Sequence, residues 1–183
     1  MPNHDGAQGD RASRIPAVFS TSRMRATRIQ AADLDDLIRP HLDPDVSRFL
    51  GGVRSPEQTA AYVEVQLRHW REHGFGLWIL RSEQGGFLGR AGLRYVELEG
   101  KRALEIAYTF AKAAWGRGLA SEVATALVDL WLATIAEPVL VGIVEKGNSA
   151  SERVLLKAGF TYDRDAWFHD AGVGVFHRLR VLR

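Results

Sequence analysis

The sequence predicts a mixed α/β domain whose central sheet is mostly antiparallel and is flanked by helices. Three observations support this fold class. Extended segments between Phe75 and Phe110 are joined by short glycine turns, which is typical of an antiparallel meander. From Gly116 onward the apolar residues recur with a helical period of about 3.6 residues. A short apolar strand, Val139–Val144, follows that helix, and this order predicts a β-α-β crossover.

Length and composition agree with one globular domain. The chain has 183 residues, of which 46% are hydrophobic and 25% are charged, so it is neither a disordered chain nor a coiled coil. Residues 1–21 are polar and lack periodicity, and we expect them to form a disordered tail. Residues 22–183 are expected to form a single domain.

Charge and cysteine content exclude several function classes. The formal net charge is only +2 and the arginines are scattered, whereas nucleic-acid-binding proteins concentrate basic residues on one face. The chain has no cysteine, which excludes disulfides, thiol catalysis and thiolate metal sites. It has no apolar run of about 18 residues and no apolar segment near its start. We therefore expect no membrane span, no secretory signal and a cytoplasmic location.

The first half of the chain contains one strong helix signal. Ser55 is a typical N-cap, Pro56 suits the first turn and Gln58 completes a capping box. The helix is expected to run to His73, and Gly74 can end it. Before it, we expect a strand at Met24–Gln30 and a short helix that opens at Asp33 and stops at Pro40.

The remaining elements follow from apolar periodicity and turn residues. In the third meander strand, Glu105 and Thr109 share one face, while Ile106 and Tyr108 share the other. We expect meander strands at Phe75–Arg81, Phe87–Leu98 and Ala103–Phe110, helices at Gly116–Ile135 and Ser149–Ala158, and later strands at Val139–Val144, Phe160–Asp163 and Val173–Leu182.

The most informative segment is the glycine-containing turn Trp115–Ala120, which joins a strand to a helix. Two glycines, Gly116 and Gly118, let the backbone approach a ligand closely. The first N–H groups of a helix have no partner within the helix, and the helix dipole adds positive potential there. This turn is therefore a candidate phosphate-binding site.

Other interpretations of this turn differ in what they require. A Walker loop needs a Gly-Lys-Ser/Thr ending, which is missing here. A dinucleotide fold needs G-x-G-x-x-G, but Ser121 stands at the third glycine position and the turn follows a meander. A tight turn that binds nothing is the remaining alternative.

The turn does not stand alone, because Ala113–Gly118 resembles the pyrophosphate-binding motif Q/R-x-x-G-x-G/A of the GNAT superfamily of N-acetyltransferases. Ala113 replaces the leading Gln or Arg, which costs one side-chain contact if backbone amides bind the ligand. The string AAWGRGLASEVATALV, the later NSASERVLLKAGF and the early SRMRATRIQAADLDDL all resemble the branch that acetylates the N-termini of ribosomal proteins. The resemblance covers roughly Ser22–Val181.

The resemblance implies a fold and a co-substrate. The sheet would splay between two parallel strands, Ala103–Phe110 and Val139–Val144, and acetyl-CoA would enter the gap. The pyrophosphate would lie on the amides of the turn, and Asn148 would hydrogen-bond the pantetheine arm or cap the helix that it begins. The implied cofactor-binding residues are Tyr108, Thr109, Phe110, Trp115, Gly116, Arg117, Gly118, Leu119, Ala120, Asn148 and Ser151.

The resemblance also implies direct attack of a neutral amine on the thioester, without an acyl-enzyme. Glu105 is the candidate general base, because it lies beside the implied gap; a glutamate that is exposed or paired with an arginine is the alternative, and His169 and His177 are rival bases. Many relatives outside this branch carry an acidic tyrosine where this chain has Leu155, so Ser151 is the candidate to hydrogen-bond the departing thiolate. A plain capping or surface hydroxyl is the alternative for Ser151.

The expected function is acetyl-CoA-dependent N-acetylation of a primary amine, with a protein N-terminal α-amine favoured. A small amine such as a polyamine or aminoglycoside stays open, as do a non-catalytic acyl-CoA-binding module and a nucleotide-binding oxidoreductase. No metal, nucleic acid or membrane partner is expected, and a homodimer is common in the family. Aromatic residues that could line the acceptor pocket are Trp70, Phe75, Trp78, Tyr95, Trp167 and Phe168.

Overall fold

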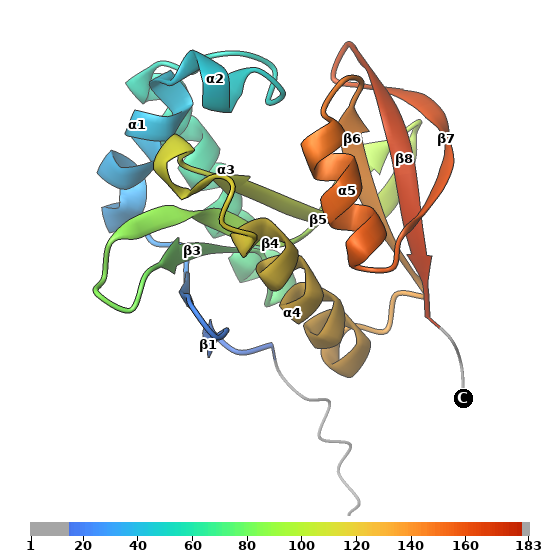
Figure 1. Ribbon diagram of the computed structural model, residues 1–183, viewed down its shortest axis with the longest axis horizontal. Coiled ribbons are helices and arrows are strands. Elements are labelled where there is room, and N and C mark those ends of the chain that lie inside the picture. Colours follow the sequence, from blue (N-terminus) through green and yellow to red (C-terminus); the bar gives the residue numbers. More distant parts are fainter. Residues whose placement is uncertain (1–14, 181–183) are drawn as a thin grey trace, which may run out of the picture.

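The strands form one sheet that runs through the molecule. The computed structural model describes residues 15–180, and within them eight strands lie in the order β1-β2-β3-β4-β5-β6-β8-β7 (Figure 1). The strands are β1 (Val18–Ser20), β2 (Arg25–Arg28), β3 (Leu77–Arg81), β4 (Phe87–Leu98), β5 (Lys101–Phe110), β6 (Val139–Glu145), β7 (Thr161–Phe168) and β8 (Ala171–Leu179). The α-helices are α1 (Leu34–Leu42), α2 (Pro44–Ser47), α3 (Pro56–His73), α4 (Leu119–Thr134) and α5 (Ser149–Lys157), with short 3-10 helices η1 (Ala31–Asp33) and η2 (Lys112–Ala114).

The predicted meander and crossover are both confirmed. Strands β3, β4 and β5 pair antiparallel in sequence order. Strand β6 then pairs parallel to β5, but only Glu105 and Val141 face each other as partners. Beyond this pair the two strands diverge, and β6 continues antiparallel to β8. The sheet is therefore split between the C-terminal halves of β5 and β6, as the resemblance implied.

Helices cover both faces of the sheet. Figure 1 shows α4 in front of the sheet and α3 behind it, while α5 lies over the β6–β8 half. Apolar side chains of both helices join one core: Val63 and Trp70 come from α3, and Leu127 and Trp131 come from α4. Burying such side chains stabilises the fold by about 1.5–3 kcal/mol each.

The predicted start and end of α3 are confirmed. The amide of Gln58 donates to Ser55 Oγ at 3.2 Å, and the Gln58 side chain accepts from the Ser55 amide at 2.8 Å, which completes the capping box. Gly74 adopts the left-handed conformation at φ 73° and ends the helix. The helix therefore has fixed ends, and its inner face holds residues of the site described below.

Most element boundaries differ by a few residues from those expected, and three of the differences have a clear structural reason. Strand β1 lies inside the segment predicted to be a tail, because its three residues pair with β2; residues 1–14 lie outside the described part of the chain. Helix α1 continues two residues past Pro40, so the missing proline N–H did not end it. Strand β7 extends to Phe168 instead of ending at Asp163, because a register shift between Tyr162 and Arg164 lets pairing with β8 continue. Within residues 15–180, no helix is both long enough and apolar enough to cross a membrane.

Candidate active site

A cleft opens where β5 and β6 diverge. It is a cavity of about 670 Å³, and residues of both β5 and β6 line it. Residues 106–109 of β5 and 142–145 of β6 line it, together with the first turn of α5, the β7–β8 turn and the segment that leads into α3. Residues from both faces of the sheet thus line one cleft. This arrangement suits a reaction between two substrates that approach from opposite faces of the sheet.

The glycine turn begins just past the end of β5. Gly116 and Gly118 both have positive φ, 71° and 74°, which explains why glycine stands at these two positions. No side chain caps the first amides of α4, because its N-cap is Gly118. A Cβ placed on Gly116 would meet no heavy atom within 4 Å, so the space beside the turn is open. Free amides and open space are what a bound phosphate requires.

Contacts from the N-terminal strands hold this turn in place. Arg23 Nη1 donates to the carbonyl oxygen of Arg117 at 2.7 Å, and Arg23 also forms an ion pair with Glu122 of α4 at 2.6 Å. Burial acts to raise the pKa of Glu122, but hydrogen bonds from Thr21, Arg23 and Ser22 outweigh it and lower that pKa to about 2. The Glu122 carboxylate therefore stays charged and helps to anchor the start of α4.

Ser151 and Tyr108 meet across the cleft. Ser151 Oγ donates to the Tyr108 hydroxyl at 3.0 Å, and that hydroxyl donates to the Ser151 carbonyl oxygen at 3.1 Å. Asn148 caps α5, since its Oδ1 accepts from the Ser151 amide at 3.2 Å. Leu155 is buried and packs against Gly142 of β6. The structure thus brings together Asn148, Ser151 and Tyr108. The hydrogen bond between the Tyr108 hydroxyl and Ser151 was not predicted from the sequence.

Glu105 lies on the opposite face of β5. Its side chain is only 7% exposed and pairs with Arg94 of β4, whose Nε donates to Glu105 Oε2 at 2.7 Å. The structure therefore shows the arginine-paired glutamate that was the alternative to a free base. The carboxylate still lines the cleft, so it is within reach of a bound molecule, but it must share or release Arg94 to accept a proton.

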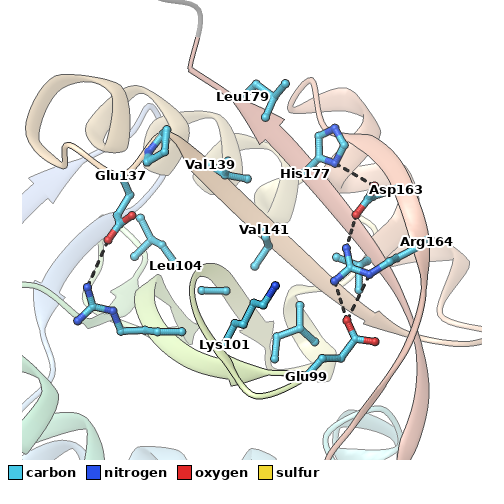
Figure 2. A pocket seen from close by; sticks show the side chains of 15 residues that line it. Glu99, Lys101, Leu104, Glu137, Val139, Val141, Asp163, Arg164, His177 and Leu179 are labelled. Atoms are coloured by element: carbon cyan, nitrogen blue, oxygen red, sulfur yellow. Dashed lines mark hydrogen bonds and ion pairs between the residues drawn. The ribbon is translucent and has the colours of Figure 1, made fainter.

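The two rival histidines lie in different cavities. His169 lies at the β7–β8 turn and lines the cleft. His177 instead lines a second cavity of about 500 Å³, where its Nδ1 lies 3.6 Å from Asp163 (Figure 2). There Arg164 pairs with both Asp163 and Glu99, so this cavity is walled by paired charges. Of the two, only His169 is placed to act on a molecule in the cleft.

Most of the aromatic residues predicted to line the acceptor pocket lie elsewhere in the structure. Only Phe168 lines the cleft. Trp70 and Trp78 belong to the core, and Trp167 is 74% exposed on the edge strand β7. Tyr95 and Phe75 pack with each other near His69, away from the opening.

Among the cleft-lining residues that were not predicted from the sequence are Arg54, Tyr62, Arg90 and Arg94. Arg90 and Arg94 lie on the same face of β4 as Gly92, since side chains alternate along a strand. Two arginines on one face of a central strand were the available signal, because a fully charged side chain is rarely placed inside a sheet without a reason. Within residues 15–180, no group of three or more His, Asp or Glu side chains could hold a metal ion.

Comparisons with known proteins agree with this geometry. A family model described as an acetyltransferase (GNAT) domain matches residues 23–161. The uncharacterized protein YkkB of Bacillus subtilis (strain 168) is 31% identical over 137 residues, which are 74% of this chain and 80% of YkkB.

Two solved structures show the same fold. The acetyltransferase from Agrobacterium tumefaciens str. C58 is 27% identical, with a TM-score of 0.79 over 90% of this chain and 94% of that one. The acetyl transferase from Salmonella typhimurium that modifies the N-terminal serine of 50S ribosomal subunit protein L7/L12 is 17% identical, with a TM-score of 0.73 over 90% and 98%. At that lower identity the likeness concerns the fold.

Proposed function

This chain belongs to the GNAT acetyltransferase family and is an acyltransferase, and from that premise we propose that it moves an acetyl group from acetyl-CoA to a primary amine by direct attack in a ternary complex. The observation that supports this most is the order of features along one strand. Strand β5 diverges from β6 after Glu105, ends at Phe110 and leads through η2 into the open glycine turn. An extended ligand that lies along the end of β5 can therefore place a phosphate on the turn.

The residues present fit the co-substrate. The uncapped amides of α4 and the open space beside Gly116 would hold its pyrophosphate. The edge of β5 at Tyr108, Thr109 and Phe110 would bind its pantetheine arm through main-chain hydrogen bonds, since β6 supplies no partner there. At Phe110 the carbonyl oxygen already accepts from Trp115 Nε1 at 2.9 Å. When bound, acetyl-CoA supplies the thioester, an activated acyl group with a good leaving group.

The chain's own residues take three roles in this proposal. Glu105 accepts the proton that the amine must lose before it has a free electron pair, directly or through water. Ser151 and Tyr108 form a hydroxyl pair in the cleft, and one of the two would turn its proton from its present acceptor to the sulfur, where negative charge builds as the C–S bond breaks. Asn148 fixes the first turn of α5 so that the Ser151 side chain lies in the cleft.

We favour the α-amine of a protein N-terminus as the acceptor class, on the resemblance of the glycine turn and of the Asn148–Phe160 segment to the ribosomal-protein branch. The cleft, of about 670 Å³, has room for the end of an extended chain. A small amine is the alternative acceptor.

A screen of amines and N-terminal peptides, read as free thiol released from acetyl-CoA, tests the proposal. We expect thiol release that depends on an amine and yields one acetylated amine per thiol. Binding of CoA by calorimetry without any amine-dependent release would instead indicate a non-catalytic acyl-CoA-binding module. A change in NAD(P)H absorbance would indicate an oxidoreductase.

A further inference from the structure

Positive charge gathers on the wall of the cleft that faces away from α5. Arg54, Arg90 and Arg94 all line it, and among them only Arg94 has a carboxylate partner within residues 15–180, Glu105. One further acid, Glu145, lines the cleft from β6. Three guanidinium groups against two carboxylates, one of them already paired, leave an excess of positive charge.

Arg90 is the centre of this group. It is only 5% exposed, yet its Nε has no hydrogen-bond partner among residues 15–180. Burial, and then the neighbouring Arg94 and Arg54, lower its pKa, but an arginine in a protein stays protonated. A buried cation with an unpartnered donor is costly, so such a group is usually kept for a ligand that completes it.

Arg54 is a second guanidinium with an unpartnered N–H donor among the described residues. Its Nη2 donates to the Leu50 carbonyl oxygen at 2.9 Å, whereas its Nη1 is buried and has no partner among the described residues. Both Arg54 and Arg90 lie over the ring of Tyr62, at 5.3 and 5.1 Å from its centre. Two like charges therefore lie near one ring, and an anion that contacts both guanidiniums would stabilise them.

A buried histidine lies near the same two arginines. His41 is buried, with Nδ1 3.0 Å from Thr59 Oγ1. Burial, followed by the charges of Arg90 and Arg54, lowers the pKa of His41 to about 3. His41 of α1 therefore lies close to the same two guanidinium groups.

We propose that Arg90 and Arg54 form an anion-binding subsite, and that the acceptor is an amine that carries a carboxylate or phosphate group close to its nitrogen. This inference rests on the proposed acetyl transfer and adds the chemical class of the acceptor. The anionic group would lie between the two guanidiniums, on the face of the sheet that also carries Glu105, with the amine directed toward the split. Polyamines and aminoglycosides, which are multiply cationic, would be repelled by this wall.

Matched pairs of acceptors test the inference. Glycine is compared with glycinamide, phosphoethanolamine with ethanolamine, and peptides that carry aspartate as second residue with peptides that carry asparagine. The value of kcat/KM is calculated per unprotonated amine, because the members of a pair differ in amine pKa. We expect the anionic member of at least one pair to be favoured tenfold or more. Preference within the first two pairs identifies a small molecule as source, and preference within the peptides identifies an acidic N-terminus.

Variants separate this subsite from the rest of the reaction. Arg90→Gln and Arg54→Gln should each remove most of the preference while CoA affinity, measured by calorimetry, stays within about twofold. Arg54→Gln is the safer variant, because Arg54 is only partly buried. Arg68→Gln, an exposed position on α3, is the matched control and should keep the preference.

The outcomes are distinguishable from failure of the proposed function. Amine-dependent thiol release that favours neutral or cationic acceptors equally or more would overturn the anion subsite and leave the acetyl transfer intact. The subsite is also overturned if the arginine variants lose CoA affinity rather than acceptor preference, since the guanidiniums would then bind the co-substrate. Absence of thiol release with every amine would count against both.

Discussion

The hydroxyl of Tyr108 accepts a hydrogen bond from Ser151 Oγ and donates one to the Ser151 carbonyl oxygen, at 3.0 and 3.1 Å. These two bonds connect β5 with α5 across the split in the sheet. Burial raises the pKa of Tyr108 to about 12, so its proton is retained at neutral pH. The hydroxyl proposed to stabilise a developing thiolate thus belongs to a pair of residues; from the sequence, this role was expected of Ser151 alone, and Tyr108 was expected only to bind the co-substrate.

Replacing Ser151 with alanine should slow turnover by roughly tenfold to 100-fold, or about 1.4–2.7 kcal/mol of transition-state stabilisation. The reason is that a hydrogen bond to sulfur strengthens as charge builds on it. Steady-state kinetics with acetyl-CoA measure the change, and the melting temperature should stay nearly constant. The Ser149→Ala variant, at the exposed start of α5, is the control and should turn over normally.

Tyr108→Phe removes the partner hydroxyl and completes a double-mutant cycle with Ser151→Ala. If the two hydroxyls act as one unit, the double variant should be no slower than the slower single variant. Turnover at the wild-type level in both single variants, with a lower melting temperature, would make the pair a structural bond between β5 and α5.

For the general base, Glu105→Gln keeps the shape of the side chain and removes its basicity. The rate should fall by about 10²–10⁴, with acetyl-CoA affinity largely kept. Glu97→Gln, an exposed position on β4, is the matched control. A near-normal rate across pH 6 to 9, with reduced thermal stability, would assign Glu105 to the ion pair with Arg94 alone.

A bulky residue in the glycine turn should weaken co-substrate binding. Gly118→Val forces a β-branched side chain into positive φ and into the space in front of α4, so affinity for CoA should fall tenfold or more, about 1.4 kcal/mol. Gly100→Val is the matched control, because Gly100 in the β4–β5 turn has the same φ of 74°; a Cβ there would meet nothing within 4 Å, and one at Gly118 would make only an ordinary 3.7 Å contact with Arg23 Nη2. Calorimetry that shows equal affinity for both variants would remove the turn from the binding site.

Stability should depend on pH through His41. Its pKa is about 3 in the folded protein and 6.5 in its unperturbed state, so the unfolded chain binds more protons between these values. The free energy of unfolding should therefore fall as the pH drops below about 6.5, by up to about 1.4 kcal/mol per unit from this group. Urea denaturation from pH 4.5 to 7.5 measures the slope.

Two variants isolate this effect. His41→Phe should flatten the pH dependence while lowering stability at pH 7.5, since the contact with Thr59 is lost. Thr59→Val removes the same hydrogen bond but keeps the titrating ring, so the slope should persist. A slope unchanged in His41→Phe would assign the acid sensitivity to other groups.

The sequence predicted most of the fold, because local signals were strong where they existed. The capping box at Ser55, the glycine turn at Gly116–Gly118 and the alternation along β5 each depend on a few neighbouring residues. Strand β1 was missed, since three residues with no alternation form a strand only when β2 lies beside them. The far end of β7 was missed for the same reason, because its pairing resumes after a register shift.

In the site, too, residues close together in the sequence were predicted, and residues from separate segments were not. Asn148 and Ser151 are neighbours on one helix, so their spacing placed them together. Arg54, Tyr62 and Arg90 come from three separate segments, and only the folded packing brings the two guanidiniums over one ring. Whether Glu105 is free or paired with an arginine could not be decided from the sequence, because the contact with Arg94 depends on the register between β4 and β5.

The single pair of facing residues between β5 and β6, Glu105 and Val141, also divides the molecule into two mechanical units. One unit contains β1 to β5, and the other contains β6, β8, β7 and α5; few backbone hydrogen bonds resist their separation. Their side chains share one core, but because so few backbone bonds join them we expect hydrogen exchange to report the two units as regions of different protection. A ligand that bonds to the free edge of β5 supplies the missing bridge, so its binding should make the two units unfold as one.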